Sequence, residues 1–282
     1  MKKQFYSLGL MGYPLGHSYS PTMQKAALLT ARINGDYQLF PVPPLPDGYL
    51  ALTSLLQSIR NRDLTGLNIT IPHKQSIQPL VDRLTPLAAK IGAVNILYLE
   101  NGELIGGNTD CPAFLSDLKN SFRLDKSSVK NALVMGAGGS ARAVVYALHQ
   151  DGWNVHVAAR REAQVNDLIT SLDLNNVQPI RLEAEILSSQ QDITLVVNAT
   201  PAGMSPKVNL SPWPKGLHLP ENAAVYDLIY NPAETMLMKT AREAGLQTVN
   251  GLGMLVEQAA LSFEIWTGVA APRDAMRQSV KI

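Results

Sequence analysis

The stretch "NALVMGAGGSARAVVYALHQ" (residues 131–150) decides the fold of the second half of this 282-residue chain. It contains a short apolar run at 131–135, then Gly136, Gly138 and Gly139, then an amphipathic helical pattern. A strand, a glycine-rich turn and a helix in this order are typical of a dinucleotide-binding turn, where helix N-terminal amides hold a pyrophosphate. Such turns also occur without a nucleotide, so the motif alone does not decide the function.

On either side of this turn, short apolar segments alternate with helical patterns. After it we expect strands at 154–159, 192–199 and 223–229, and helices at 162–172 and 235–245. Short apolar strands that alternate with helices form doubly wound, mostly parallel sheets. The second half of the chain is therefore predicted to be a Rossmann-like domain.

The first half also reads as strands and helices. We predict strands at 5–11, 37–42 and 66–71, and helices at 20–30 and 48–60, the first capped by Ser20 ahead of Pro21. Asn101-Gly102 predicts a hairpin turn between two strands. A helix at 112–120, a polar linker at 121–130, and closing helices at 253–267 and from 272 complete an α/β chain of two domains.

Composition narrows the class of protein. Hydrophobic residues make up 46% and charged residues 17% of the chain, which excludes disorder. A net charge of +1 gives no reason to expect nucleic acid or an anionic membrane as partner. A single cysteine, Cys111, excludes an intramolecular disulfide, and no apolar run approaches the ~18 residues of a membrane span. We expect a cytoplasmic enzyme or binding protein for a small ligand.

The strand after the glycine-rich turn ends in Arg160 and Arg161, where an NAD-binding domain normally has an acidic residue. Guanidinium groups suit the 2′-phosphate of NADP. NADP is therefore the preferred cofactor, and two solvated arginines at a helix start are the alternative.

Three segments place polar residues where apolar ones are usual. In "LNITIPHK" (67–74), Asn68 and Thr70 share one face of a strand and Lys74 follows, although a solvated edge strand would look the same. Asp110 ends another strand and could equally cap the next helix. Gln258 interrupts an apolar helical stripe. The five histidines show no metal-ligand spacing, so we predict a metal-free site.

Taken together, eight segments resemble the shikimate dehydrogenase family over nearly the whole chain. They are "GYPLGHSYSP", "LNITIPHK", "IGAVN", "GELIGGNTD", "VMGAGGSARA", "VNATPAGM", "YDLIYNP" and "NGLGMLVEQA". The resemblance implies a substrate-binding catalytic domain of residues 1–110 plus 251–282, an NADP-binding domain of 111–250, and a cleft between them. The implied reaction is reversible reduction of 3-dehydroshikimate to shikimate by NADPH, in aromatic amino-acid biosynthesis.

The resemblance also implies roles for single residues. Lys74 and Asp110 match the catalytic pair. The positions that match substrate-binding residues are Ser18, Ser20, Asn68, Thr70, Asn95, Tyr230 and Gln258. The positions implied for NADP are Gly136, Ala137, Gly138, Gly139, Ser140, Arg160, Arg161, Thr200 and Gly251.

Some positions depart from the family pattern, including Ile96, Cys111 and Gln164. Two other interpretations therefore stay open. One is a quinate/shikimate dehydrogenase with looser substrate choice and use of NAD. The other is a catalytically silent relative, which retention of Lys74 and Asp110 argues against. The sequence is compatible with a monomer or a homodimer.

Overall fold

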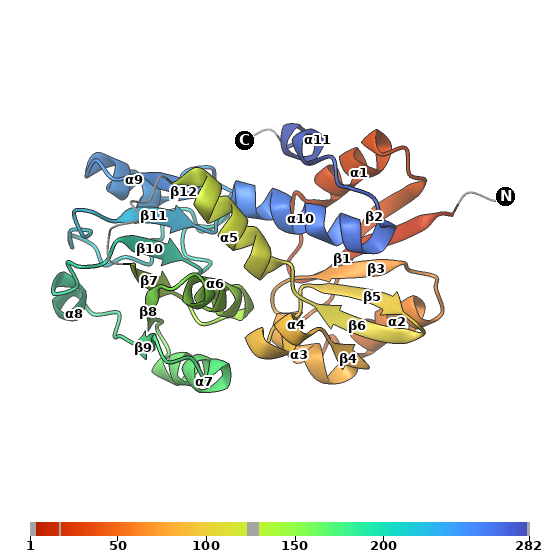
Figure 1. The fold of residues 1–282 in the computed structure, drawn as a ribbon, viewed down its shortest axis with the longest axis horizontal. Coiled ribbons are helices and arrows are strands. Elements are labelled where there is room, and N and C mark those ends of the chain that lie inside the picture. Colours follow the sequence, from red (N-terminus) through yellow and green to blue (C-terminus); the bar gives the residue numbers. More distant parts are fainter. Residues whose placement is uncertain (1–3, 17, 123–129, 281–282) are drawn as a thin grey trace. The chain divides into compact units, whose positions relative to one another are not determined.

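The computed structural model describes residues 4–16, 18–122 and 130–280, which divide into two compact α/β units (Figure 1). Unit 1 comprises the described residues up to Asp110 and from Val256 onward, and unit 2 those from Cys111 to Leu255. The division in the C-terminal part falls after Leu255, later than residue 250 expected from the sequence. Of the predicted linker, residues 123–129 lie outside the described part of the chain.

Unit 1 is built on a six-stranded mixed sheet in the order β2-β1-β3-β5-β6-β4. Its strands are β1 (Tyr6–Gly12), β2 (Gly35–Pro41), β3 (Gly66–Ile69), β4 (Arg83–Leu84), β5 (Ile96–Glu100) and β6 (Glu103–Gly107). The first three pair in parallel, and β3, β5 and β6 pair antiparallel. This arrangement places β3 in the middle of the sheet, so the edge-strand interpretation of residues 67–71 was wrong.

Helices cover the unit 1 sheet. They are α1 (Ser20–Thr30), α2 (Tyr49–Arg60), α3 (His73–Ser76), the 3-10 helix η1 (Gln78–Leu80), α4 (Pro86–Ile91), the part of α10 (Leu252–Thr267) from Val256, and α11 (Arg273–Gln278). One apolar core includes Leu52 and Ile59 of α2 together with Leu67 and Ile69 of β3. Burial of this apolar surface is the main stabilising contribution to the unit.

Unit 2 contains a six-stranded parallel sheet in the order β12-β11-β10-β7-β8-β9. Its strands are β7 (Asn131–Met135), β8 (Asn154–Ala158), β9 (Val177–Pro179), β10 (Leu195–Asn198), β11 (Ala224–Asp227) and β12 (Thr248–Asn250). The helices are α5 (Asp110–Ser121, from Cys111), α6 (Gly139–Gln150), α7 (Glu162–Leu172), α8 (Ala184–Ser188), α9 (Met236–Glu243) and the start of α10. The doubly wound parallel sheet predicted for this half is confirmed.

Local details confirm some predictions and correct others. Asn101 and Gly102 both have positive φ, 52° and 87°, as the predicted hairpin between β5 and β6 requires. Ser20 is not the N-cap of α1; Tyr19 holds that position, and Ser20 is the first helical residue. Helix α5 begins at Asp110 rather than Pro112, so the carboxylate of Asp110 is not a cap for a helix starting at Pro112.

Candidate active site

Lys74 and Asp110 form a largely buried ion pair in unit 1. Lys74 Nζ lies 2.6 Å from Asp110 Oδ2, and the two side chains are only 14% and 5% exposed. A buried pair of this kind needs further hydrogen bonds to offset the desolvation of both charges. An ammonium and a carboxylate in direct contact can donate a proton to a neighbouring oxygen atom and take it back.

The backbone around Lys74 is held by two contacts. The Lys74 carbonyl accepts a hydrogen bond from Val94 N at 2.7 Å. The neighbouring His73 ring is fully buried, and its Nε2 donates to the Val42 carbonyl at 2.9 Å. These contacts fix the short helix α3, and so they fix where the lysine side chain starts.

Asn95 positions the carboxylate. Its Nδ2 donates to Asp110 Oδ1 at 2.9 Å and to Thr109 Oγ1 at 2.8 Å, while its Oδ1 accepts from Thr109 N at 2.7 Å. Both amide hydrogens of Asn95 are thus used within the protein. With Lys74 on one oxygen of Asp110 and Asn95 on the other, the carboxylate has a single orientation.

A second amide, that of Asn68, extends the network across the sheet. Tyr37 OH donates to Asn68 Oδ1 at 2.9 Å, and the Ser20 side chain lies beside the same phenol. Asn68 Nδ2 donates to the Asn95 carbonyl at 3.2 Å and to Ser262 Oγ at 2.9 Å. Burial raises the pKa of the Tyr37 phenol, which therefore stays protonated and acts as the donor.

Four of the residues predicted for the substrate and the proton thus join one network through their side chains: Lys74, Asn68, Asn95 and Asp110. Gln258 joins it through its backbone carbonyl, which accepts from Thr109 Oγ1 and Ser262 Oγ. Ser18 is joined to Ser20, whose backbone N–H donates to Ser18 Oγ at 3.3 Å. The half-buried Thr70 hydroxyl makes no hydrogen bond to any residue the structure describes.

Three members of the network had not been predicted: Tyr37, Thr109 and Ser262. Gln258 had been placed on a buried stripe of α10, but Gln258 and Leu261 are half-buried, and Ile265 is exposed. Ser262 is the fully buried polar residue of this helix. A serine among Ala259, Ala260 and Phe263 is a weak signal in sequence, because serine is tolerated within helices.

In unit 2, the predicted glycine-rich turn follows β7 and opens α6. Gly136 has φ 123°, and a Cβ there would lie 2.9 Å from the Ala199 carbonyl oxygen, so a side chain is excluded. Gly138 is the N-cap residue of the twelve-residue α6 and offers no side-chain cap, with open space at its Cβ position. An uncapped helix N-terminus reached over open space fits a pyrophosphate.

Beyond β8 stand the exposed Arg160 and Arg161. Within the described parts of the chain, neither guanidinium has a hydrogen-bond or ion-pair partner. Two unpaired cations at the carboxyl end of the strand beside the turn fit a phosphate on an adenosine ribose.

The carboxyl ends of β10 and β11 are organised by a buried carboxylate. Asp227 accepts hydrogen bonds from Asn198 Nδ2, Thr235 Oγ1 and Ile229 N at 2.9, 2.7 and 3.0 Å. Burial raises the pKa of Asp227 to about 6. Asn198 in turn accepts from the backbone N and hydroxyl of Thr200, and this fixes the predicted cofactor-binding threonine at the end of β10.

Gly251 and Tyr230 complete the predicted residues of unit 2. A Cβ on Gly251 would lie 2.0 Å from the Leu228 carbonyl oxygen, so this close approach of two segments requires glycine. Tyr230 follows β11 and is half-buried. Both therefore lie beyond the carboxyl ends of the strands, the edge where doubly wound sheets bind ligands.

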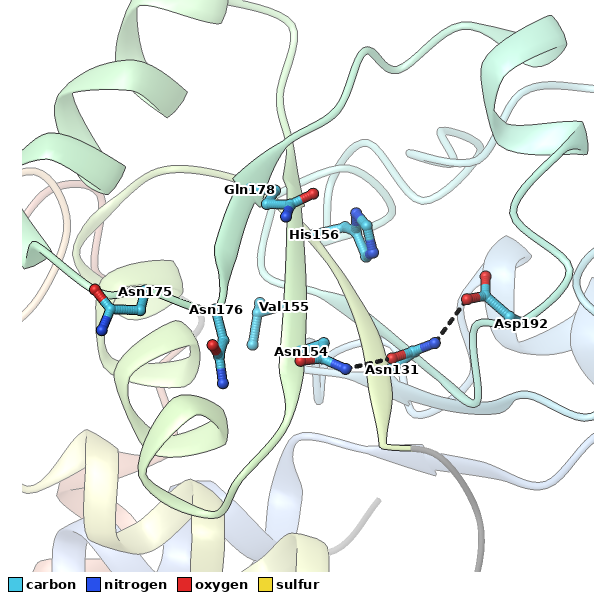
Figure 2. Close-up of a pocket in the computed structure, with 8 residues that line it drawn as sticks. All are labelled: Asn131, Asn154, Val155, His156, Asn175, Asn176, Gln178 and Asp192. Carbon is cyan, nitrogen blue, oxygen red and sulfur yellow. Dashed lines mark hydrogen bonds between the residues drawn. The ribbon is translucent and has the colours of Figure 1, made fainter.

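A separate polar pocket of about 300 Å³ lies at the opposite edge of this sheet (Figure 2). It is lined by residues at the amino ends of the strands: Asn131, Asn154, Val155, His156, Asn175, Asn176, Gln178 and Asp192. None of these is a predicted site residue. Among the described residues, no group of three or more His, Cys, Asp or Glu is placed to hold a metal ion. None of the described helices combines the length and the hydrophobicity that a membrane span needs.

Comparison with known proteins gives a consistent picture. The family model described as the shikimate dehydrogenase substrate binding domain matches residues 10–97, and the shikimate 5′-dehydrogenase C-terminal domain matches residues 251–281. The shikimate dehydrogenase (NADP(+)) of Desulforamulus reducens is 38% identical, over 95% of this chain and 92% of that protein.

Solved structures agree with this picture. The structure of shikimate 5-dehydrogenase from Thermus thermophilus with NADP(H) and shikimate is 34% identical, with a TM-score of 0.83 over 97% of this chain and 98% of that one. Quinate dehydrogenase from Corynebacterium glutamicum in complex with NAD is 28% identical, with a TM-score of 0.85 over 98% and 99% of the two chains.

Proposed function

This chain belongs to the shikimate dehydrogenase family, and from that premise we propose that it is an NADP-dependent shikimate dehydrogenase. The reaction is the reversible reduction of 3-dehydroshikimate to shikimate, an oxidoreduction at a CH–OH group. Unit 1 binds the substrate and carries the proton-transfer groups, and unit 2 binds the nucleotide.

The observation that carries this proposal is the ion pair of Lys74 and Asp110 at 2.6 Å. It places a proton donor and acceptor in a dry part of unit 1, held by Asn95 on the far carboxylate oxygen. The pair holds a proton beside the reacting oxygen, donating it during ketone reduction and accepting it during alcohol oxidation. A binding protein has no need of two desolvated charges held in this way.

The rest of the polar network suits a cyclic polyol carboxylate. Neutral amides and hydroxyls recognise hydroxyl groups, and they reject analogues that leave a buried partner unpaired. We propose Asn68, Thr70 and Gln258 as groups facing the substrate hydroxyls, with Asn95 lining the pocket and orienting Asp110. Ser18 and Ser20 are proposed for the carboxylate, and Tyr230 of unit 2 stays a prediction for the same group.

NADPH supplies the hydride when bound. The residues that fit it are the turn of Gly136, Ala137, Gly138, Gly139 and Ser140 for the pyrophosphate, with Thr200 and Gly251 at the neighbouring strand ends. Arg160 and Arg161 fit the 2′-phosphate because both are exposed and unpaired among the described residues.

The second candidate is a dehydrogenase that also accepts quinate and NAD. The observation in its favour is the likeness to a quinate dehydrogenase solved with NAD. The two arginines favour NADP, because NAD has no phosphate to pair with their charges.

The test of the proposed function is removal of the Lys74 amine. In Lys74→Ala, we expect kcat for shikimate oxidation to fall by about 10³, within the usual range for general acid–base groups. NADP affinity should stay close to that of the unaltered protein, and the variant should still unfold cooperatively in urea, at a lower midpoint because Asp110 loses its partner.

The matched control is Lys25→Ala in the same unit. Lys25 also pairs with an aspartate, Asp36, at 2.9 Å, but both side chains are largely exposed. This control should keep full activity, since exposed ion pairs contribute little. A Lys74→Ala variant that turns over at a near-normal rate would contradict the proposed role of the pair.

A further inference from the structure

Ser262 lies at the centre of the buried network of unit 1. It stands one turn after Gln258 on α10, and it is 0% exposed. Its hydroxyl lies 2.8 Å from the Gln258 carbonyl oxygen and 2.9 Å from Asn68 Nδ2, with Thr109 Oγ1 at 3.4 Å. One serine thus links β3, α10 and the residue that precedes α5.

Backbone carbonyls fix the direction of these hydrogen bonds, because a carbonyl can only accept. The Gln258 carbonyl takes the hydroxyl hydrogen of Ser262, which leaves the Ser262 oxygen to accept from Asn68. The other amide hydrogen of Asn68 goes to the Asn95 carbonyl at 3.2 Å. Both donors of Asn68 are therefore consumed inside the protein.

Only acceptor capacity remains on Asn68. Its Oδ1 has two lone pairs, and one accepts from Tyr37 OH at 2.9 Å. The other can accept a hydrogen bond from a hydroxyl of a ligand. It cannot bond to a ketone, ether or carboxylate oxygen, because those groups have no hydrogen to donate.

We propose that Ser262 is a positioning residue that sets substrate selectivity: by taking one amide hydrogen of Asn68, it makes Asn68 a pure acceptor for a substrate hydroxyl. The inference rests on the proposed function, which supplies a polyol as the substrate. It assigns selectivity to a fully buried residue that acts through its hydrogen bond to Asn68.

The first test is Ser262→Ala, which removes the acceptor and leaves one Asn68 N–H unpaired. Without its bond to Ser262, the Asn68 amide is no longer held with Oδ1 available to the substrate hydroxyl. Loss of that one hydrogen bond to the substrate predicts a KM for shikimate that is about tenfold higher. We expect kcat to change by less than about threefold and the KM for NADP to stay the same, because neither Lys74 nor unit 2 is altered. A purely structural role would lower the amount of folded enzyme without moving KM.

The second test is selectivity for a donor. Analogues of shikimate in which a non-reacting hydroxyl is replaced by fluorine keep the size of the group but cannot donate. The unaltered enzyme should discriminate strongly against one of these analogues. In Ser262→Ala the same ratio of kcat/KM values should shrink by about tenfold, since an Asn68 amide that Ser262 no longer holds can rotate and present an N–H to the fluorine.

The matched control is Thr267→Val on the same helix. Thr267 also donates to the carbonyl four residues back, Phe263, at 2.7 Å, and the other hydrogen bond of its hydroxyl is accepted from Val269 N, within the described residues. This variant should leave KM and the fluoro-analogue ratio unchanged. If it raises KM as Ser262→Ala does, the effect belongs to α10 in general and the inference fails.

A double-mutant cycle tests whether Ser262 acts through Asn68. In an Asn68→Ala background, Ser262→Ala should add no further change in KM. If the two residues acted independently, the fold-changes in KM of the two substitutions would multiply. Ser262→Cys, which keeps a weak acceptor, should fall between serine and alanine and serves if the alanine variant folds poorly.

The outcomes separate the inference from the proposed function. Suppose that the unaltered enzyme oxidises shikimate and that Ser262→Ala changes neither KM nor the analogue ratio. This result overturns the inference and leaves the proposed function standing. Absence of turnover by the unaltered enzyme contradicts the proposed function. The Asn68–Ser262 coupling is then read from urea unfolding of the same four proteins, where additive effects overturn the inference.

Discussion

Each unit has a buried carboxylate near its predicted site residues, and these two carboxylates have different partners. Asp110 of unit 1 pairs with the ammonium of Lys74 at 2.6 Å. Asp227 of unit 2 is 0% exposed and accepts hydrogen bonds from the neutral donors of Asn198, Thr235 and Ile229. The Asp110 carboxylate, with the ammonium of Lys74 beside it, is suited to proton transfer. The Asp227 carboxylate, surrounded by neutral donors, is suited to ordering the segments that supply those donors.

The same contrast holds for the surroundings of each carboxylate. In unit 1 we propose that a buried network recognises the small substrate, and most hydrogen-bond donors of this network bond to other groups of the protein. In unit 2 we propose that the backbone amides at the uncapped N-terminus of α6 and the exposed Arg160 and Arg161 recognise the nucleotide. Fixed polar groups can distinguish one polyol from similar ones, whereas positive charge and backbone amides are enough to bind a phosphate.

Asp110→Asn should have the largest effect, because it removes the charge from the carboxylate that does chemistry. The amide keeps the shape and can still accept from Asn95, but Lys74 loses its counter-ion. We expect kcat for shikimate oxidation to fall by about 10²–10³. The KM for NADP should be unchanged in steady-state kinetics, and activity within a factor of two of the original would contradict the assignment of Asp110.

Asp227→Asn should instead alter the dependence of stability on pH. Burial raises the pKa of Asp227 to about 6, from 3.8. Between these values the folded state binds more protons than the unfolded state, so the free energy of unfolding falls as pH rises and is level above about 6. Asparagine has no proton to lose. The variant should therefore gain stability relative to the unaltered protein across this window, by up to about 3 kcal/mol.

Urea unfolding at pH 4, 5, 6 and 7 measures this difference. Asp151→Asn is the control with a pKa shift of opposite sign: burial raises the pKa of Asp151, but hydrogen bonds from Lys119 and Lys130 outweigh burial and lower it. Its stabilising contribution is nearly complete above its ordinary pKa of 3.8 and is lost only at lower pH, so between pH 4 and 7 the Asp151→Asn difference should stay nearly constant. An Asp227→Asn difference that does not change with pH would show that Asp227 is not the group that titrates.

Replacing Arg160 and Arg161 by alanine should have a smaller effect, confined to the nucleotide. Loss of charge-assisted hydrogen bonds to a 2′-phosphate predicts a KM for NADP that rises about thirtyfold. The KM for NAD should stay the same, since NAD lacks that phosphate. Equal changes for both nucleotides in initial-rate measurements would remove the arginines from cofactor selection.

Long periodic elements were predictable from the sequence, and short ones were not. Helices α2 and α6 and strands β1 and β7 follow apolar patterns that report which face is buried. The two-residue β4 and the three-residue β9 exist because they pair with β6 and β8, which local sequence does not encode. Asn68 looked like part of an edge strand because central and edge strands share the same alternation.

Site residues were predictable from the sequence where they lie in a segment that resembles the family. Lys74 and Asp110 are 36 residues apart, and only the resemblance suggested that they meet. Tyr37, Thr109 and Ser262 stayed hidden because nothing in their local sequence distinguishes them from ordinary strand, loop and helix residues. Their roles depend on partners brought close by tertiary packing, as with Ser262 and Asn68, which are 194 residues apart.

The most direct test of the account is kcat/KM for the unaltered protein with shikimate or quinate and with NADP or NAD, in all four combinations, followed by nucleotide absorbance. We expect strong activity with shikimate and NADP, and much weaker activity in the other three combinations. Comparable activity with quinate or NAD would contradict the proposed selectivity, and no activity in any combination would contradict the proposed function itself.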